Sequence, residues 1–144
     1  MSPAWWDKLG LGVPLIRPAQ TYPDAVGTAM FTAVGRVCLT SIIGEVMVAP
    51  IDGGCTNCSL VTETIDIATA VAITGDAVGQ RYSVATIGGA LVVLPPHVDL
   101  YQPIILWDTD QIGITITVGP TTDGQIQWAI RYHPMEEGAY VALA

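Results

Sequence analysis

The last third of the chain has the most regular alternation of apolar and polar residues. Residues 111–118 and 125–133 each place an apolar side chain at every second position, which predicts two half-buried strands. Turn-forming residues fill the break between them, and 139–143 predicts a short closing strand. We interpret the three as an antiparallel meander whose apolar face a second sheet must cover. The apolar members of the two long arms are Ile112, Ile114, Ile116, Val118, Ile126, Trp128, Ile130 and Tyr132.

The middle of the chain predicts further short strands and no helix of useful length. Its β-branched content favours strand over helix. Over the whole chain we expect seven to nine short strands, which predicts the all-β class. The favoured fold is a jelly-roll-type antiparallel β-sandwich, and the alternative is an up-and-down or Greek-key barrel. The expected strands are 30–39 interrupted by Gly35, 42–49 after a connection at Thr40 and Ser41 with a bulge at Gly44, one long strand over 60–73, 81–94 kinked at Gly88 and Gly89, and 104–107 before a turn at 108–110.

Residues 1–27 differ from the rest of the chain because four prolines exclude a long helix and a central strand. We therefore divide the chain into an extended arm, 1–27, and a sandwich domain, 28–144. The arm is expected to lie along another surface, so deleting residues 1–20 should leave a folded domain. The alternative is an arm that folds back on its own domain. The partner-binding candidates are its apolar residues Trp5, Trp6, Leu9, Leu11, Leu15 and Ile16.

Charge is scarce in this chain of 144 residues: 12% of residues are charged and 51% are hydrophobic. The length indicates one domain, and the low charge indicates that part of the surface is covered, which favours a homo-oligomer, a trimer before a dimer. The net charge of −8 disfavours a nucleic-acid partner. No apolar run approaches eighteen residues, so we expect no membrane span, and the N-terminal residues do not resemble a secretory signal.

No stretch of the sequence matches a catalytic or cofactor-binding pattern, so we expect no enzyme activity, cofactor or metal. Cys55 and Cys58 form a C-x-x-C motif, which we interpret as two small residues of a glycine-rich loop. The alternatives are a zinc site, for which a second pair of ligands is missing, and a disulfide. Residues 108–113 begin like a calcium loop, but Ile112 cannot ligate, so a capped turn is expected there. His97 and His133 are interpreted as loop and strand-end residues, and Glu136-Glu137 as a solvated turn. Three cysteines fit a reducing cytosol.

The segment from Trp128 to Ala139 reads Trp-Ala-Ile-Arg-Tyr-His-Pro-Met-Glu-Glu-Gly-Ala, a strand followed by a proline, an acidic pair and a glycine turn. With the low-charge β-rich composition of 28–144 and the arm before it, this resembles small structural proteins of tailed bacteriophage virions, especially capsid decoration or cement proteins. The resemblance implies a β-sandwich, often trimeric or dimeric, on the outside of a capsid, where it clamps neighbouring major capsid subunits after synthesis in the host cytoplasm. The cysteine pair is not part of that pattern.

Two other classes remain open from the sequence. One is a different virion component, namely a head fibre, an adaptor or a tail protein, which copy number per particle would distinguish. The other is a cellular carbohydrate-binding β-sandwich, which binding to sugars would reveal.

Overall fold

The computed structural model describes residues 12–20, 28–48, 57–62, 66–73, 75–94, 103–117 and 124–144. Within these residues the chain forms eleven strands and no helix, which confirms the all-β class. None of the described residues therefore belongs to a helix that could cross a membrane. The strands are β1 (Val13–Ile16), β2 (Thr28–Val34), β3 (Val37–Val48), β4 (Asn57–Val61), β5 (Asp66–Val71), β6 (Arg81–Val84), β7 (Leu91–Leu94), β8 (Ile104–Leu106), β9 (Gln111–Thr117), β10 (Gln125–Pro134) and β11 (Tyr140–Leu143).

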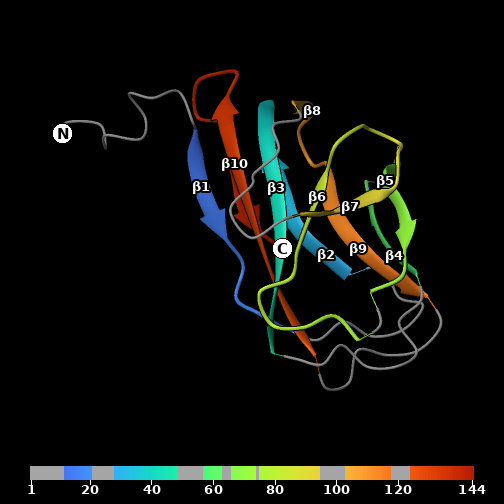
Figure 1. Ribbon diagram of the computed structural model, residues 1–144. Coiled ribbons are helices and arrows are strands. Elements are labelled where there is room, and N and C mark those ends of the chain that lie inside the picture. The colour runs from blue at the N-terminus through green and yellow to red at the C-terminus, as the bar shows by residue number, and fades with distance from the viewer. Residues whose placement is uncertain are drawn as a thin grey trace.

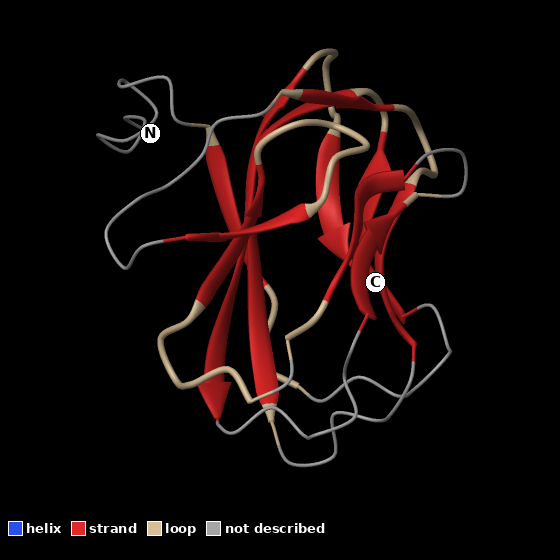
Figure 2. Cartoon of the chain, turned by 45° about the vertical axis from the view of Figure 1, so that its right-hand side comes forward, coloured by secondary structure: helices blue, strands red, loops and turns tan. Residues whose placement is uncertain are grey.

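The strands form two antiparallel sheets (Figures 1 and 2). Sheet A has the order β1-β10-β3-β6-β7, and β8 pairs with the beginning of β3. Sheet B has the order β11-β2-β9-β4-β5. Apolar side chains from both sheets form one buried core, which includes Phe31, Leu39, Leu60, Ile112 and Trp128.

The alternation in the last third of the chain identified the buried side chains correctly, but the predicted meander is wrong. Ile112 and Ile114 are buried, as are all four apolar members of β10. However, β9 and β11 belong to sheet B, whereas β10 lies in sheet A between β1 and β3. Alternation shows which side of a strand is apolar and says nothing about which sheet the strand joins. The break before β10 was long enough to cross between sheets.

The predicted connection at Thr40 and Ser41 is also wrong, because β3 runs unbroken through it. The chain turns earlier, at Gly35, whose φ is 74°. Thr40 is instead the extra residue of a β-bulge: Arg131 pairs with Ser41, but the next residue of β10 pairs with Leu39. The Thr40 hydroxyl donates to the Arg131 carbonyl oxygen at 3.1 Å, so the irregularity has its own hydrogen bond.

Gly44 does not mark the bulge that the sequence predicted. It pairs with Trp128 on one side and with Tyr82 on the other, and both side chains are buried in the core. A Cβ on Gly44 would stand 2.8 Å from ring atoms of Trp128. The glycine therefore gives the indole room to lie across β3.

Two predicted single strands are hairpins. Residues 60–73 were expected to be one bent strand, but they contribute to β4 and β5, which pair with each other. Residues 81–94 form β6 and β7, and the expected kink is the turn between them. That turn reaches the other sheet, because Gly88 N–H donates to the Ile67 carbonyl at 3.0 Å and Thr69 N–H donates to the Gly89 carbonyl at 2.8 Å. The β5 and β7 edges of the two sheets are thus joined.

The opposite edges of the sheets are joined by Arg17, just after β1. Its guanidinium donates to the Met30 carbonyl at 2.9 Å and to the Ala144 carbonyl at 2.7 Å. Since β1 pairs with β10 along its whole length, residues 12–20 belong to the domain. The sandwich domain was predicted to begin only at residue 28, but residues 13–16 and Gln20 pair with β10, so this described part of the arm follows the alternative and folds back on its own domain.

Candidate functional site

The structure describes two of the six predicted partner-binding residues, both on β1. Leu15 is half-buried and packs against the core, so it serves the chain's own fold. Ile16 points to the outer face of sheet A and is 56% exposed. Pro14 is tolerated between them because β1 is an edge strand, where a missing N–H leaves no gap in the ladder. The other four, Trp5, Trp6, Leu9 and Leu11, lie outside the described residues.

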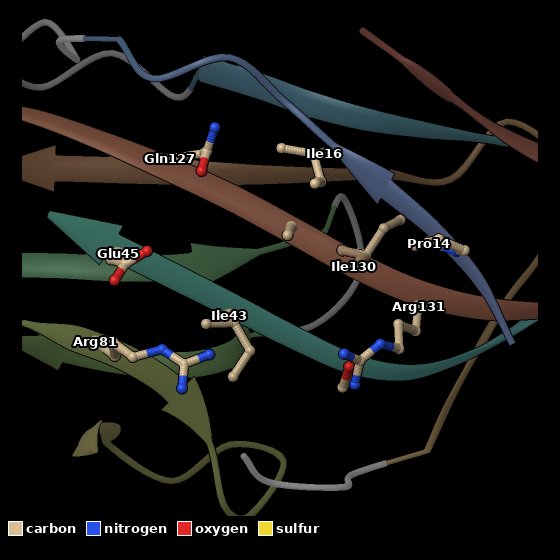
Figure 3. A pocket seen from close by; sticks show the side chains of 10 residues that line it. Pro14, Ile16, Ile43, Glu45, Arg81, Gln127, Ile130 and Arg131 are labelled. Atoms are coloured by element: carbon tan, nitrogen blue, oxygen red, sulfur yellow. The ribbon is translucent and has the colours of Figure 1, made fainter. Parts of the chain in front are cut away.

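The outer face of sheet A holds a groove of about 170 Å³ that crosses four neighbouring strands (Figure 3). Ile43 and Ala129 form its apolar floor, and Ile16 stands at the β1 side. Two arginine side chains border it on either side of Ile43, as Figure 3 shows for Arg81 and Arg131. The remaining lining residues are Pro14, Ser41, Glu45, Gln127 and Ile130.

The second candidate surface is one end of the sandwich, where three turns are tied together. Asp108 accepts a hydrogen bond from the Gly35 N–H at 2.9 Å, and Glu136 accepts one from the Arg36 N–H at 2.8 Å. Met135 N–H donates to the Arg36 carbonyl at 2.9 Å. The turn before β9 and the turn before β11 are therefore fixed to the corner between β2 and β3.

Large apolar side chains remain exposed at this end. Trp107 is 60% exposed, and the Arg36 guanidinium carbon lies 5.5 Å from the centre of its ring. Exposed Met135, Val34 and Tyr140 lie on the same three turns or beside them. We call these five residues the Trp107 end. Tryptophan, tyrosine, methionine and arginine are the residues most enriched in protein interfaces, and a fixed backbone reduces the entropy lost on docking.

The sequence motifs considered for metals have structural roles where they are described. Asp108 caps the Gly35 corner, and Asp110 accepts from the Trp107 N–H at 2.9 Å, which agrees with a capped turn at 108–110. Cys58 is buried in the core, and His133 lies on β10. Among the described residues no three histidine, cysteine, aspartate or glutamate side chains gather as a metal site would require. Cys55 and His97 lie outside those residues.

Sequence reasoning named neither the groove nor the Trp107 end. The groove had a weak signal, because Arg131 occupies a polar position of a strand whose face was correctly predicted. The other groove residues Ile43 and Arg81 come from β3 and β6. Apolar–polar alternation along the chain does not show that these strands pair next to β10. Trp107 had a stronger signal, since a tryptophan directly before an Asp-Thr-Asp turn is poorly placed for burial.

No protein-family model, no curated protein and no solved structure matches this chain.

Proposed function

We propose that this protein is a structural component of a tailed-phage virion that binds the outside of the capsid and clamps neighbouring major capsid subunits. The observation that carries the proposal is the Trp107 end, where exposed aromatic and apolar side chains are held on a fixed backbone. Such a surface suits attachment to a protein better than diffusion as a free monomer. The sequence resemblance of 28–144 supplies the kind of partner, and a jelly-roll connection of the strands belongs to the same proposal.

The N-terminal arm keeps a role in this proposal, limited to residues 1–11. β1 fixes the chain to the edge of sheet A, so the apolar residues before Gly12 start from a defined place on the domain. Trp5, Trp6, Leu9 and Leu11 provide anchors of the type that dominate interface energies. The homo-oligomer, a trimer before a dimer, is proposed on the same ground of low charge, and sedimentation of the isolated chain at micromolar concentration tests it. A clean monomer of 15.2 kDa would contradict it.

The decisive experiment is co-sedimentation of the purified chain with shells assembled from the major capsid protein of the virus whose genome encodes the chain. We expect saturable binding in many copies per shell. Trp107→Ala should weaken binding at least 10-fold, since interface tryptophans typically contribute about 2 kcal/mol or more. Val78→Ala is the matched control: Val78 is 62% exposed, close to the 60% of Trp107, and its turn binds the other end of β3.

Three outcomes would argue against this function. Absence of binding to shells rejects the capsid clamp. Binding in the copy number of a single ring favours an adaptor or tail protein. Saturable binding to an array of sugars, with none to shells, favours the carbohydrate-binding alternative.

A further inference from the structure

The groove over Ile43 carries a charge opposite to that of the whole molecule. The chain has thirteen acids, only five bases and a net charge of −8. Two of those five bases, Arg81 and Arg131, line this groove, together with one acid, Glu45. The charges of the described lining residues thus sum to +1. An anionic partner repelled by the rest of the molecule finds complementary charge here.

The spacing of the two arginines further restricts the ligand. Arg81 pairs with Glu45 and Arg131 pairs with Ser41, so the arginines stand four residues apart along β3. At about 3.3 Å per residue that offset is roughly 13 Å. Ile43 lies midway, with Ala129 beside it in the ladder.

An extended peptide has the same geometry. Its side chains at positions i, i+2 and i+4 point to one face and span about 13 Å. Carboxylates at the two outer positions would reach the two guanidinium groups, whose fork matches a carboxylate. An aliphatic side chain at the middle position would lie on Ile43 and Ala129, in a hollow of about 170 Å³.

We propose that this groove binds an extended segment of a partner protein with the pattern acid-x-aliphatic-x-acid. Nucleic acid is disfavoured, because a phosphate backbone would meet the net charge of −8 and gain nothing from the apolar floor. The inference rests on the proposed function only for the source of the segment, which is then an acidic loop or arm of the capsid subunit.

The test uses the full chain and the peptide N-acetyl-Glu-Ser-Leu-Ser-Glu-amide, titrated while the arginine side-chain NMR signals are recorded. We expect saturable shifts at Arg81 and Arg131, with the signals of Arg17 and Arg36 unchanged. Replacing both glutamates of the peptide by glutamine, or its leucine by serine, should weaken binding. Since partly exposed ion pairs contribute about 0.2–1 kcal/mol, Arg81→Gln and Arg131→Gln should each weaken binding roughly 2–5-fold. Ala72→Glu, at an exposed position directly after β5 of sheet B, is the charge-matched control, because it also lowers the net charge by one.

Equal binding of the glutamine peptide would overturn the inference, as would equal shifts at all arginines or an equal loss of affinity in the Ala72→Glu control. A drop in the sedimented mass of the Arg81→Gln/Arg131→Gln variant would also overturn it, because a second copy of the chain would then be the occupant. The proposed function fails separately. If the chain binds shells but not the peptide, only the proposed peptide site in the groove is refuted. If it binds the peptide but not shells, only the proposed capsid partner is refuted.

Discussion

Gly44 shows how one residue without a side chain determines the packing of the core. Trp128 is completely buried opposite it, and its ring comes within 2.8 Å of the place where a Cβ would stand. Ala at this position would gain about 0.5–1 kcal/mol by restricting the unfolded chain. Overpacking against a buried ring costs about 1–3 kcal/mol, so the loss outweighs the gain.

Gly44→Ala is therefore expected to lower the free energy of unfolding by about 1–2 kcal/mol, measured by chemical denaturation. The control is the same substitution in a Trp128→Ala background, where the ring is gone. Trp128→Ala alone should cost about 3–5 kcal/mol, since the indole is buried. In the Trp128→Ala background, Gly44→Ala should be neutral or stabilising. An equal cost in both backgrounds would show that the ring is not what excludes the side chain.

Residue-level properties were the most predictable from sequence. All four apolar members of β10 are buried as the alternation indicated, and the acids at 108–110 cap a turn as expected. Gly44 and Thr40 were misinterpreted for one reason: their roles depend on residues of β10 about ninety positions away along the chain. The local sequence around a glycine does not show whether the glycine ends a strand, forms a bulge or faces a tryptophan.

At the scale of elements, the sandwich is closed differently on its two sides. Backbone hydrogen bonds join β5 to the turn before β7, whereas the β1 side is held by the Arg17 side chain. A side-chain link can be removed without changing any strand. It therefore offers a direct measure of what the closure contributes.

We expect Arg17→Met to destabilise the protein by about 1–2 kcal/mol, because the stem is retained but the charged donors to two carbonyls are lost at a partly exposed site. Hydrogen exchange should accelerate in β1 and at Ala144 while β3 stays protected. Val93→Ala, at a 47% exposed position of the same sheet, should leave both almost unchanged. Unaltered exchange in β1 after Arg17→Met would mean that the ladder to β10 holds the strand alone.

The elements themselves were only partly predictable. β8, β9, β10 and β11 were expected close to their observed positions, but β4 and β5 were merged into one strand, as were β6 and β7. Residues 62–65, Thr-Glu-Thr-Ile, lack the glycine or proline that would mark a turn, and Gly88-Gly89 was interpreted as a kink within one strand. Ile16, one residue that lines the candidate groove, was predicted to bind a partner, but the groove as a whole could not be predicted, because it exists only where β1, β10, β3 and β6 become neighbours.

At the scale of the whole molecule, the N-terminal residues divide into two parts with different roles. Leu15 packs on the core, and Arg17 links the sheets, so residues 12–20 are needed for the fold. The expectation that the domain tolerates deletion of residues 1–20 is therefore replaced. We expect that only residues before Gly12 can be removed without loss of the fold.

Deleting residues 1–11 should leave the melting temperature almost unchanged and reduce binding to capsid shells. Deleting residues 1–20 removes a half-buried leucine and the Arg17 link, about 2–3 kcal/mol together. At about 2–4 °C per kcal/mol, the melting temperature should fall by roughly 4–12 °C. Thermal unfolding of the two truncated chains decides the matter. Equal melting temperatures would place β1 outside the stable domain, and a large loss from the shorter deletion would place residues 1–11 inside it.

The position of β10 also governs when this protein can fold. Val13 of β1 pairs with Tyr132, and Val37 at the start of β3 pairs with Pro134. During synthesis, two early strands of sheet A thus lack their neighbour until the ribosome has added about a hundred further residues. Sheet A should therefore form late and slowly, as is usual where pairings join distant parts of a chain. Until then the apolar faces of β1 and β3 stand uncovered, which makes the nascent chain the state most prone to aggregate.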